Sequence, residues 1–235
     1  MASNKELLFY TTPEHSCSYL ADQQAKSLFL DPEQTLNTLI YSQLIDLGFR
    51  RSGKHVYRPN CSNCEACISV RIPVADFIPK RQQRRILKKN TDLSVKLIRS
   101  IDTDEHYQLY EKYISRRHAD GDMYPPERDS YRDFLCQRSS MSYYLQYSLD
   151  DKIVGVAVSD LLNQGLSAVY SFFDPDYEKR SLGGFMILSQ VAQCKDLGLA
   201  YLYLGYWIKN SSKMAYKSDY RPLELYINQQ WLRLS

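Results

Sequence analysis

The chain has 235 residues, of which 44% are hydrophobic and 24% charged, and its net charge is +3 at pH 7. This composition is typical of a folded globular protein with a sizeable core, and it excludes a low-complexity or disordered chain. The sequence contains no apolar run near the roughly 20 residues that a membrane-spanning helix needs. So small a net charge does not by itself indicate a nucleic-acid partner.

The chain begins MASNKELLFY, without the basic and then apolar segments of a secretory signal, so we expect a cytoplasmic protein. Its six cysteines are therefore expected to be thiols or ligands and not disulfides. The composition changes near residue 100, from a cysteine-bearing and basic region to one rich in aromatic and strand-forming residues. We predict two regions on this basis, residues 1–100 and residues 101–235.

An amphipathic helix is predicted in the first region. Asp31 is a suitable N-cap and Pro32 a suitable first helical residue, while Gly48 fits the position after the last turn. The apolar residues between them recur at helical spacing. A turn at 51–54 then leads into a short strand at 55–58.

Three cysteines follow at two-residue gaps, Cys61, Cys64 and Cys67, and a strand of alternating apolar residues occupies 68–74. Thiolates at this spacing suit zinc or an iron–sulfur cluster. Both usually need four ligands, and the candidates for the fourth are Cys17, His15 and His55. The alternative is a set of reduced, partly buried thiols beside a tight turn.

The segment KRQQRRILKK at 80–89 is the most basic in the chain. On a helix its six charged side chains share about half of the circumference, with an apolar anchor on the other side. Six like charges without acids between them repel one another, so a polyanion is a better explanation than a merely solvated face.

Strands and helices alternate between residues 90 and 165. We predict a strand at 93–97 and a helix from a capping box of Asp102 and Glu105 to Arg117. After Pro125-Pro126 we predict a helix at 129–138 and a hairpin of strands at 143–148 and 153–161.

Residues 166–205 read as strand, loop, helix and strand. An aromatic strand at 167–173 is followed by Arg180-Ser181-Leu182-Gly183-Gly184, a helix, and a strand at 201–204 that Gly205 is expected to end. A helix that begins at two glycines presents unpaired backbone N–H groups and a positive dipole end, which suits an anion. The tail is predicted to hold a short helix near 213–217 and a last strand.

This stretch resembles the core of the GNAT acyltransferases, in which the helix N-terminus holds the pyrophosphate of an acyl-coenzyme A. Arg180 and Gly183 match the family pattern, whereas Phe185 stands where the family has a small residue. The resemblance implies an α+β fold, with a GNAT-like mixed-sheet acyltransferase core and a smaller cysteine-bearing N-terminal region. For the motif taken alone, an ordinary glycine-rich helix start is the alternative.

A second resemblance covers about residues 10–231. The motifs that carry it, in order, are Cys17-Ser18-Tyr19-Leu20, the cysteines at 61–67, KRQQRRILKK, SFFDPDYEKRSLGGF, YLYLGYWI and KMAYKSDYRP. Together they resemble the aminoacyl-tRNA–protein transferases, which move an amino acid from its tRNA to the N-terminus of an acceptor protein and so mark it for degradation.

The compact length is similar to that of the bacterial branch, whose members use leucyl-tRNA and acceptors with N-terminal Asp or Glu. The longer eukaryotic members use arginyl-tRNA, and leucine is expected here by analogy alone. The resemblance therefore implies leucyl-tRNA and acidic N-termini as partners, with no membrane, no DNA and no cofactor needed for transfer.

Charge and placement suggest how tRNA is held. The phosphodiester at the tRNA terminus would bind Arg180, Ser181 and the N–H groups near Gly183 and Gly184. The tRNA backbone would bind the basic helix through Lys80, Arg81, Arg84, Arg85, Lys88 and Lys89.

The expected chemistry is direct attack of the acceptor α-amine on the ester of leucyl-tRNA. Asp174 and Glu178 are the candidate bases, with a turn cap as the alternative role of Asp174. The reaction cleft is expected between the strand ends at 171–173 and 205–206, where Tyr206 lies and where backbone N–H groups could hold the oxyanion.

The acidic residue of the acceptor needs a cation, and the candidates are Arg180, Lys217 and Arg221. Leucine needs an apolar pocket, for which the candidates are Phe172, Phe173 and Leu182. Packing in the core is the more common role of such apolar residues.

Four other functions fit parts of the sequence. An arginyl-tRNA transferase would keep the acceptors and change the donor. A coenzyme A-dependent GNAT acetyltransferase is disfavoured by Phe185 and by the basic helix. A zinc or iron–sulfur sensor, or a plain tRNA-binding module, would bind its ligand without turnover.

Overall fold

The computed structural model describes residues 6–137 and 140–234. Within them, eight strands form one mixed sheet with the order β14-β13-β7-β12-β11-β10-β9-β8. The strands are β7 (Ile68–Pro73), β8 (Ser94–Ile98), β9 (Ser142–Leu149), β10 (Lys152–Leu161), β11 (Gly165–Phe173), β12 (Tyr201–Trp207), β13 (Leu223–Ile227) and β14 (Gln230–Leu234). β11 and β12 run parallel, whereas the other neighbours described in this sheet run antiparallel.

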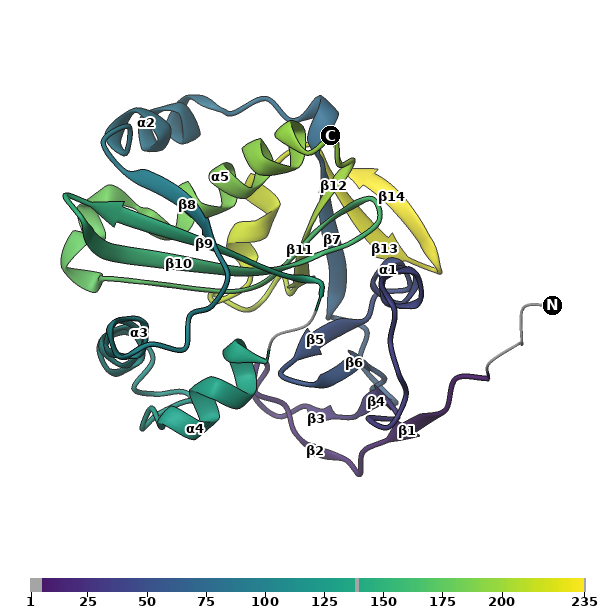
Figure 1. The fold of residues 1–235 in the computed structure, drawn as a ribbon. Coiled ribbons are helices and arrows are strands. Elements are labelled where there is room, and N and C mark those ends of the chain that lie inside the picture. The colour runs from purple at the N-terminus through teal and green to yellow at the C-terminus, as the bar shows by residue number, and fades with distance from the viewer. Residues whose placement is uncertain (1–5, 138–139, 235) are drawn as a thin grey trace.

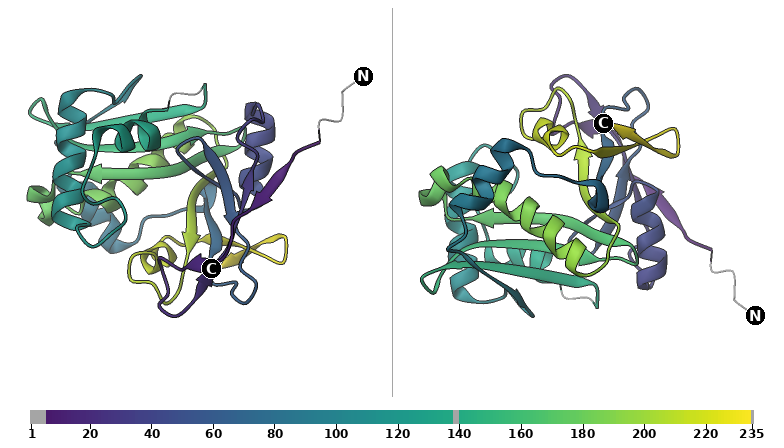
Figure 2. Two further views of the ribbon diagram at one scale, coloured as in Figure 1. Left: turned by 90° about the horizontal axis from the view of Figure 1, so that it is seen from below. Right: turned by 90° about the horizontal axis from the view of Figure 1, so that it is seen from above.

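Helices cover both faces of this sheet (Figures 1 and 2). On one face α5 (Leu182–Asp196) and α2 (Arg81–Lys89) pack over a core that includes Met186 and Val191. On the other face α3 (Asp104–Arg117) and α4 (Arg128–Tyr131) cover a second core around Phe172. The predicted mixed sheet is therefore confirmed, with α5 as the connection between the parallel strands β11 and β12.

The N-terminal region forms a smaller sheet with the order β1-β4-β6-β5. Its elements are β1 (Phe9–Thr11), β4 (Ser27–Leu30), β5 (Arg50–Ser52) and β6 (His55–Pro59), beside the pair β2 (His15–Ser16) and β3 (Gln24–Ala25) and the helix α1 (Thr38–Asp46). Its core joins the large sheet directly, because Leu162 and Tyr203 pack among its apolar residues. β7 and β8, which both precede residue 100, are strands of the large sheet.

A buried ion pair also joins the two sheets. Arg51, in β5, binds the carboxylate of Asp160, in β10, with Nε and Nη2 at 2.7 and 2.8 Å. The Tyr41 hydroxyl of α1 donates to the same carboxylate at 2.6 Å. Asp160 is only 1% exposed, so its charge depends on these partners.

Several predicted boundaries were wrong for local reasons. The first helix starts at Thr38, because Asn37 accepts the N–H of Ile40, and Asp31 instead accepts the N–H of Glu33 in a turn. The cap of α3 is Thr103, not Asp102. Arg128 and Arg132 hold the Asp102 carboxylate instead.

Three further differences concern the C-terminal half. β12 does not stop at Gly205 but passes through it as a bulge with φ +81°. The predicted 129–138 helix is α4 followed by a π-helical segment, Arg132–Cys136, and its predicted end at Arg138 lies outside the described residues. The tail folds as a 3-10 turn, Ala215–Asp219, and a two-stranded hairpin.

Replacing Arg51 with Ala should destabilise the fold by about 3–5 kcal/mol, since it leaves the Asp160 carboxylate buried without its charged partner. Urea unfolding followed by circular dichroism measures this free energy. The exposed Lys54 of the same hairpin is the control, and Lys54→Ala should change stability by less than about 0.5 kcal/mol. Equal effects of the two substitutions would contradict this role of the ion pair.

Candidate functional site

The strands β11 and β12 separate after a short parallel ladder. Their pairing covers Gly165–Tyr201, Leu166–Leu202 and Ser167–Tyr203, while β11 continues to Phe173 and β12 to Trp207. Beyond the ladder β12 pairs with β7 and β11 with β10. The separation leaves a gap in the pairing in the middle of the sheet, at the strand ends where the reaction cleft is expected.

Arg50 fills the inner end of this gap. Its Nη1 donates to Ser167 Oγ at 3.1 Å and its Nη2 to the carbonyl of Ala168, the next residue of β11. The guanidinium lies against Gly205 so closely that a Cβ there would be 2.9 Å from Arg50 Cζ. Gly205 is therefore needed both for its positive φ and for its lack of a side chain.

Lys217 binds the same short segment of β12. Its Nζ donates to the carbonyl of Tyr206 at 2.5 Å and lies 3.3 Å from Met214 Sδ. Burial, with a smaller contribution from the charge of Arg50, lowers the pKa of this ammonium to about 7. Lys217 was one of the cations expected from the sequence, whereas Arg50 was not.

A cavity of about 200 Å³ opens beside Tyr206. Tyr206 is buried, and its hydroxyl donates to the carbonyl of Gly48 at 2.9 Å, so it joins β12 to the N-terminal region. Burial raises the pKa of Tyr206 well above its usual value, and the phenol stays protonated at neutral pH. The other walls of the cavity include Tyr19, Tyr57, Cys17, Cys61, Cys64 and Cys67.

Cys61, Cys64 and Cys67 thus share one cavity wall, as their spacing predicted, and two of the candidates for a fourth ligand, Cys17 and His15, line the same cavity. Burial raises the pKa of Cys67 to about 12, with a further contribution from the thiols of Cys17, Cys61 and Cys64, so Cys67 is protonated at neutral pH. Metal binding requires thiolates. In the described residues, His, Cys, Asp and Glu side chains do not form a group of three or more that could hold a metal ion. Zinc or a cluster at these cysteines stays a prediction.

The start of α5 is packed on both sides. A Cβ on Gly183 would lie 3.2 Å from Phe173, and one on Gly184 would lie 3.3 Å from Ile86 of α2. Both glycines therefore allow close packing in addition to any contact with an anion. Ser181 precedes the helix in the left-handed region with φ +54°.

Arg180 does not point at a ligand site but holds the α5 loop to α2. Its two terminal nitrogens bind the Asp92 carboxylate at 2.7 and 2.8 Å, and Nη1 also donates to the Lys89 carbonyl. Asn90 adds a hydrogen bond from its amide to the Arg180 carbonyl at 2.9 Å. An anion would have to compete with Asp92 for the guanidinium, which disfavours the predicted contact with phosphate.

The basic helix is confirmed as α2, with its charged face in solvent. Gln83 is buried, Ile86 and Leu87 pack on the core, and the basic side chains are exposed. Within the part of the chain that the structure describes, none of these basic side chains forms an ion pair with a carboxylate. The unpaired set comprises Lys80, Arg81, Arg84, Arg85, Lys88 and Lys89.

The surroundings of the two candidate bases, Asp174 and Glu178, do not favour proton abstraction. Asp174 binds Lys112 at 2.5 Å and Lys152 at 3.0 Å and caps the next turn through the N–H of Asp176. Burial alone would raise the pKa of Asp174, but these hydrogen bonds lower it overall, which makes the carboxylate a weaker base. Glu178 is exposed on the outside of the same turn, 3.7 Å from Arg117.

The three apolar candidates for the leucine pocket differ in how deeply they are buried. Phe172 and Leu182 are fully buried in the core. Phe173 is half-buried, with its ring 4.9 Å from that of Tyr113 and beside Gly183 at the start of α5. Arg221 donates from Nε to the Ser218 carbonyl at 3.3 Å, at the end of the 3-10 turn that holds Lys217.

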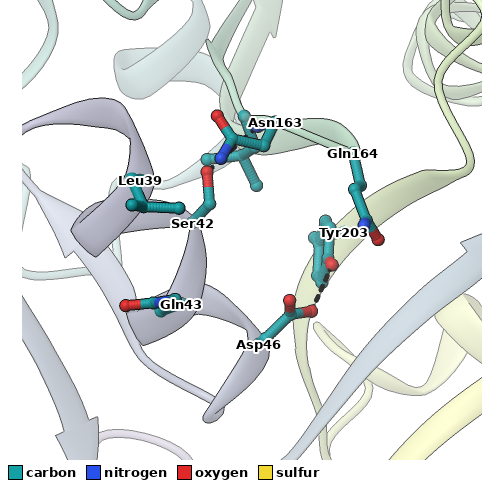
Figure 3. Close-up of a pocket in the computed structure, with 8 residues that line it drawn as sticks. Leu39, Ser42, Gln43, Asp46, Asn163, Gln164 and Tyr203 are labelled. Atoms are coloured by element: carbon teal, nitrogen blue, oxygen red, sulfur yellow. Dashed lines mark hydrogen bonds between the residues drawn. The ribbon is translucent and has the colours of Figure 1, made fainter.

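A second pocket lies between α1 and the loop after β10 (Figure 3). It has a volume of about 130 Å³, and Ser42, Asn163 and Gln164 line it. Its floor is a closed network in which the Tyr203 hydroxyl donates to Asp46 at 2.5 Å and Arg71 binds the same carboxylate at 3.0 Å. These polar groups satisfy one another, so the pocket is explained by the packing of α1 on the sheet.

Comparison with known proteins identifies relatives over the full length. Models of the N-terminus and the C-terminus of arginine-tRNA-protein transferase match residues 15–85 and 105–227. Relatives named aspartate/glutamate leucyltransferase include one from Pseudomonas fluorescens (strain Pf0-1), 52% identical, and one from Pseudomonas aeruginosa (strain LESB58), 53% identical. Each alignment covers 100% of this chain and 100% of the relative.

Among solved structures, a similar one is the C-terminal domain of a protein provisionally named lysylphosphatidylglycerol synthetase from Agrobacterium fabrum. Its TM-score is 0.46 at 15% identity, over 72% of this chain and 52% of that chain. None of the helices among the described residues is long and apolar enough to cross a membrane.

The depressed pKa of Lys217 predicts a pH-dependent stability. The unfolded chain holds this proton up to about pH 10.5 and the folded protein only to about pH 7, so stability rises with pH between these values. Lys217→Met removes this dependence. The free energy of unfolding of the Lys217→Met variant, minus that of the wild type, should therefore fall by about 1.4 kcal/mol for each pH unit between pH 7.5 and 9.5.

Urea unfolding at three pH values in this range measures the difference. Lys213→Met is the control, because Lys213 is exposed and paired at the surface with Asp120. Parallel pH profiles of the wild type and Lys217→Met would contradict the depressed pKa.

Proposed function

Because the chain belongs to the arginine-tRNA-protein transferase family, we propose that it transfers leucine from leucyl-tRNA to the α-amine of proteins that begin with Asp or Glu. The product would be an N-terminal leucine that marks the acceptor for degradation. The observation that carries the proposal is the similarity over the whole length of relatives named aspartate/glutamate leucyltransferase. An arginyl donor is the alternative for the same acceptors.

The separated strands β11 and β12 supply the place for the reaction, in a GNAT-like core. The attacking amine would form a C–N bond to the leucyl carbonyl, and the ester C–O bond to the terminal ribose would break. The proton lost by the amine would pass to the ribose oxygen that leaves. An α-amine has a pKa of about 7.7–8.0, so part of it is neutral at pH 7 without a strong base.

Positioning can therefore supply most of the rate. This agrees with the surroundings of Asp174, which is ion-paired, and of Glu178, which is exposed. Backbone N–H groups along the unpaired part of β12 are the candidates for holding the oxyanion. The transfer needs no cofactor in this scheme, which assigns no step to the cysteines.

The exposed face of α2 is suited to the tRNA backbone. It carries six basic side chains without acidic partners in the described chain, and it is fixed to the start of α5 through Asn90 and Arg180. The tRNA bound there would have its terminus directed toward the cleft. Such an enzyme would work in the cytoplasm, where charged tRNA is found.

Transfer of radiolabelled amino acid from charged total tRNA to peptides tests the function. Leucine should arrive on peptides that begin with Asp or Glu, and not on those that begin with Arg, Lys or Ala. Arginine on the acidic peptides would keep the family and change the donor. Folded protein that transfers no amino acid from any tRNA would contradict the proposal.

Replacing Arg84, Arg85 and Lys88 with Ala should weaken tRNA binding in a salt-dependent way. Each phosphate contact contributes about 0.9 to the slope of log affinity against log salt, so the slope should fall by roughly 2–3. Filter binding at several salt concentrations measures it. The control with the same charge loss replaces the exposed Lys54, Lys96 and Arg99, and a slope unchanged in the α2 variant would exclude α2 as the tRNA site.

A further inference from the structure

Two buried cations contact neighbouring residues of β12. The guanidinium of Arg50 lies against Gly205, and the ammonium of Lys217 binds the carbonyl of the next residue, Tyr206. Arg50 is 8% exposed and Lys217 is 6% exposed. They come from β5 and from the 3-10 turn near the C-terminus, so only the fold brings them together.

Neither cation has an acidic partner. Within residues 6–137 and 140–234, carboxylates do not come within 4 Å of either side chain. Other well-buried arginines of this protein are paired: Arg51 binds Asp160, and Arg71 binds Asp46 and Glu224. Buried charges are costly unless paired, and the lowered pKa of Lys217 reflects this cost, so two such groups on one segment of β12 without an anion require an explanation.

Both cations have hydrogen-bonding capacity beyond their contacts with the protein. A guanidinium has five N–H donors, and two of those of Arg50 are used by Ser167 and Ala168. An ammonium has three, and Lys217 directs one to the Tyr206 carbonyl and one toward Met214 Sδ. Both groups therefore keep donors for an incoming anion, and they lie near enough to each other that the charge of Arg50 lowers the pKa of Lys217.

The surroundings favour a small anion on a short side chain. Tyr206, whose carbonyl Lys217 binds, lines a cavity of about 200 Å³, below the roughly 300 Å³ at which sites for larger ligands begin, and the two cations lie behind this wall and not in it. A phosphodiester carries a nucleoside on each side and would not reach cations this deeply buried. The exposed basic face of α2 is better suited to that anion.

We propose that Arg50 and Lys217 form the subsite that binds the side-chain carboxylate of the acceptor's N-terminal Asp or Glu. This inference rests on the proposed function and assigns its acceptor specificity to named residues. A carboxylate held there supplies the missing counter-charge and leaves the nearby α-amine in the gap between β11 and β12. An N-terminal Asn or Gln has the same shape but cannot neutralise the two cations, so the subsite rejects it.

The test compares peptides that differ only in the first residue, Asp against Asn and Glu against Gln, in the full-length protein. Lys217→Gln and Arg50→Gln should each raise KM for the Asp peptide by roughly 30-fold or more. Transfer to the Asn peptide and KM for leucyl-tRNA should change little. Lys217→Arg keeps the charge and should retain the preference for Asp, and Lys213→Gln, which removes an exposed lysine of the same segment, should behave as wild type.

Wild-type protein that transfers leucine, with folded Lys217→Gln and Arg50→Gln variants that keep the preference for Asp, would overturn the subsite alone. A rise in KM for leucyl-tRNA in place of the peptide would assign the cations to tRNA and also overturn it. Wild-type protein that transfers nothing would refute the proposed function and the subsite together.

If both variants unfold, a crystal structure of the wild type with an Asp-Ala dipeptide decides. A carboxylate within ion-pair distance of Arg50 and Lys217 supports the subsite, and a carboxylate bound at any other cation overturns it.

Discussion

The site depends on how the gap between β11 and β12 is kept open. Parallel strands normally continue their ladder, and ending it frees backbone groups that must find partners. The Arg50 guanidinium satisfies the Ala168 carbonyl and Ser167 at the end of the ladder. Gly205 makes room for it, because any side chain there would collide with Arg50. The gap is thus a stable feature of the folded chain.

The contact of Arg50 with β11 also explains why the two halves of the chain form one structure. The strands of the gap come from the C-terminal half, whereas Arg50 comes from the N-terminal sheet. Tyr206 strengthens the connection through its hydrogen bond to Gly48, and the Arg51–Asp160 pair adds a charged one. The cysteine-bearing region lines the cavity beside Tyr206 and so packs directly on β12.

The basic helix is positioned by equally specific contacts. Ile86 packs on Gly184, and Arg180 and Asn90 bind across the junction between α2 and α5. Two of the residues that make these contacts, Arg180 and Gly184, are the ones that the sequence pattern assigns to phosphate binding. Arg180 is a positioning residue in this arrangement, since its guanidinium holds Asp92 and its neighbours instead of reaching a ligand.

The sequence by itself determined the local structure, since helical spacing, turn residues and alternating strands depend on near neighbours. It indicated β11, α5, the hairpin of β9 and β10, the exposed basic face of α2, and the family. Only the tertiary structure revealed the partners of Arg180 and Asp174 and the approach of Arg50 and Lys217 to the same segment of β12. These residues are far apart in the chain, and a side chain's charge and burial depend on what the fold places around it.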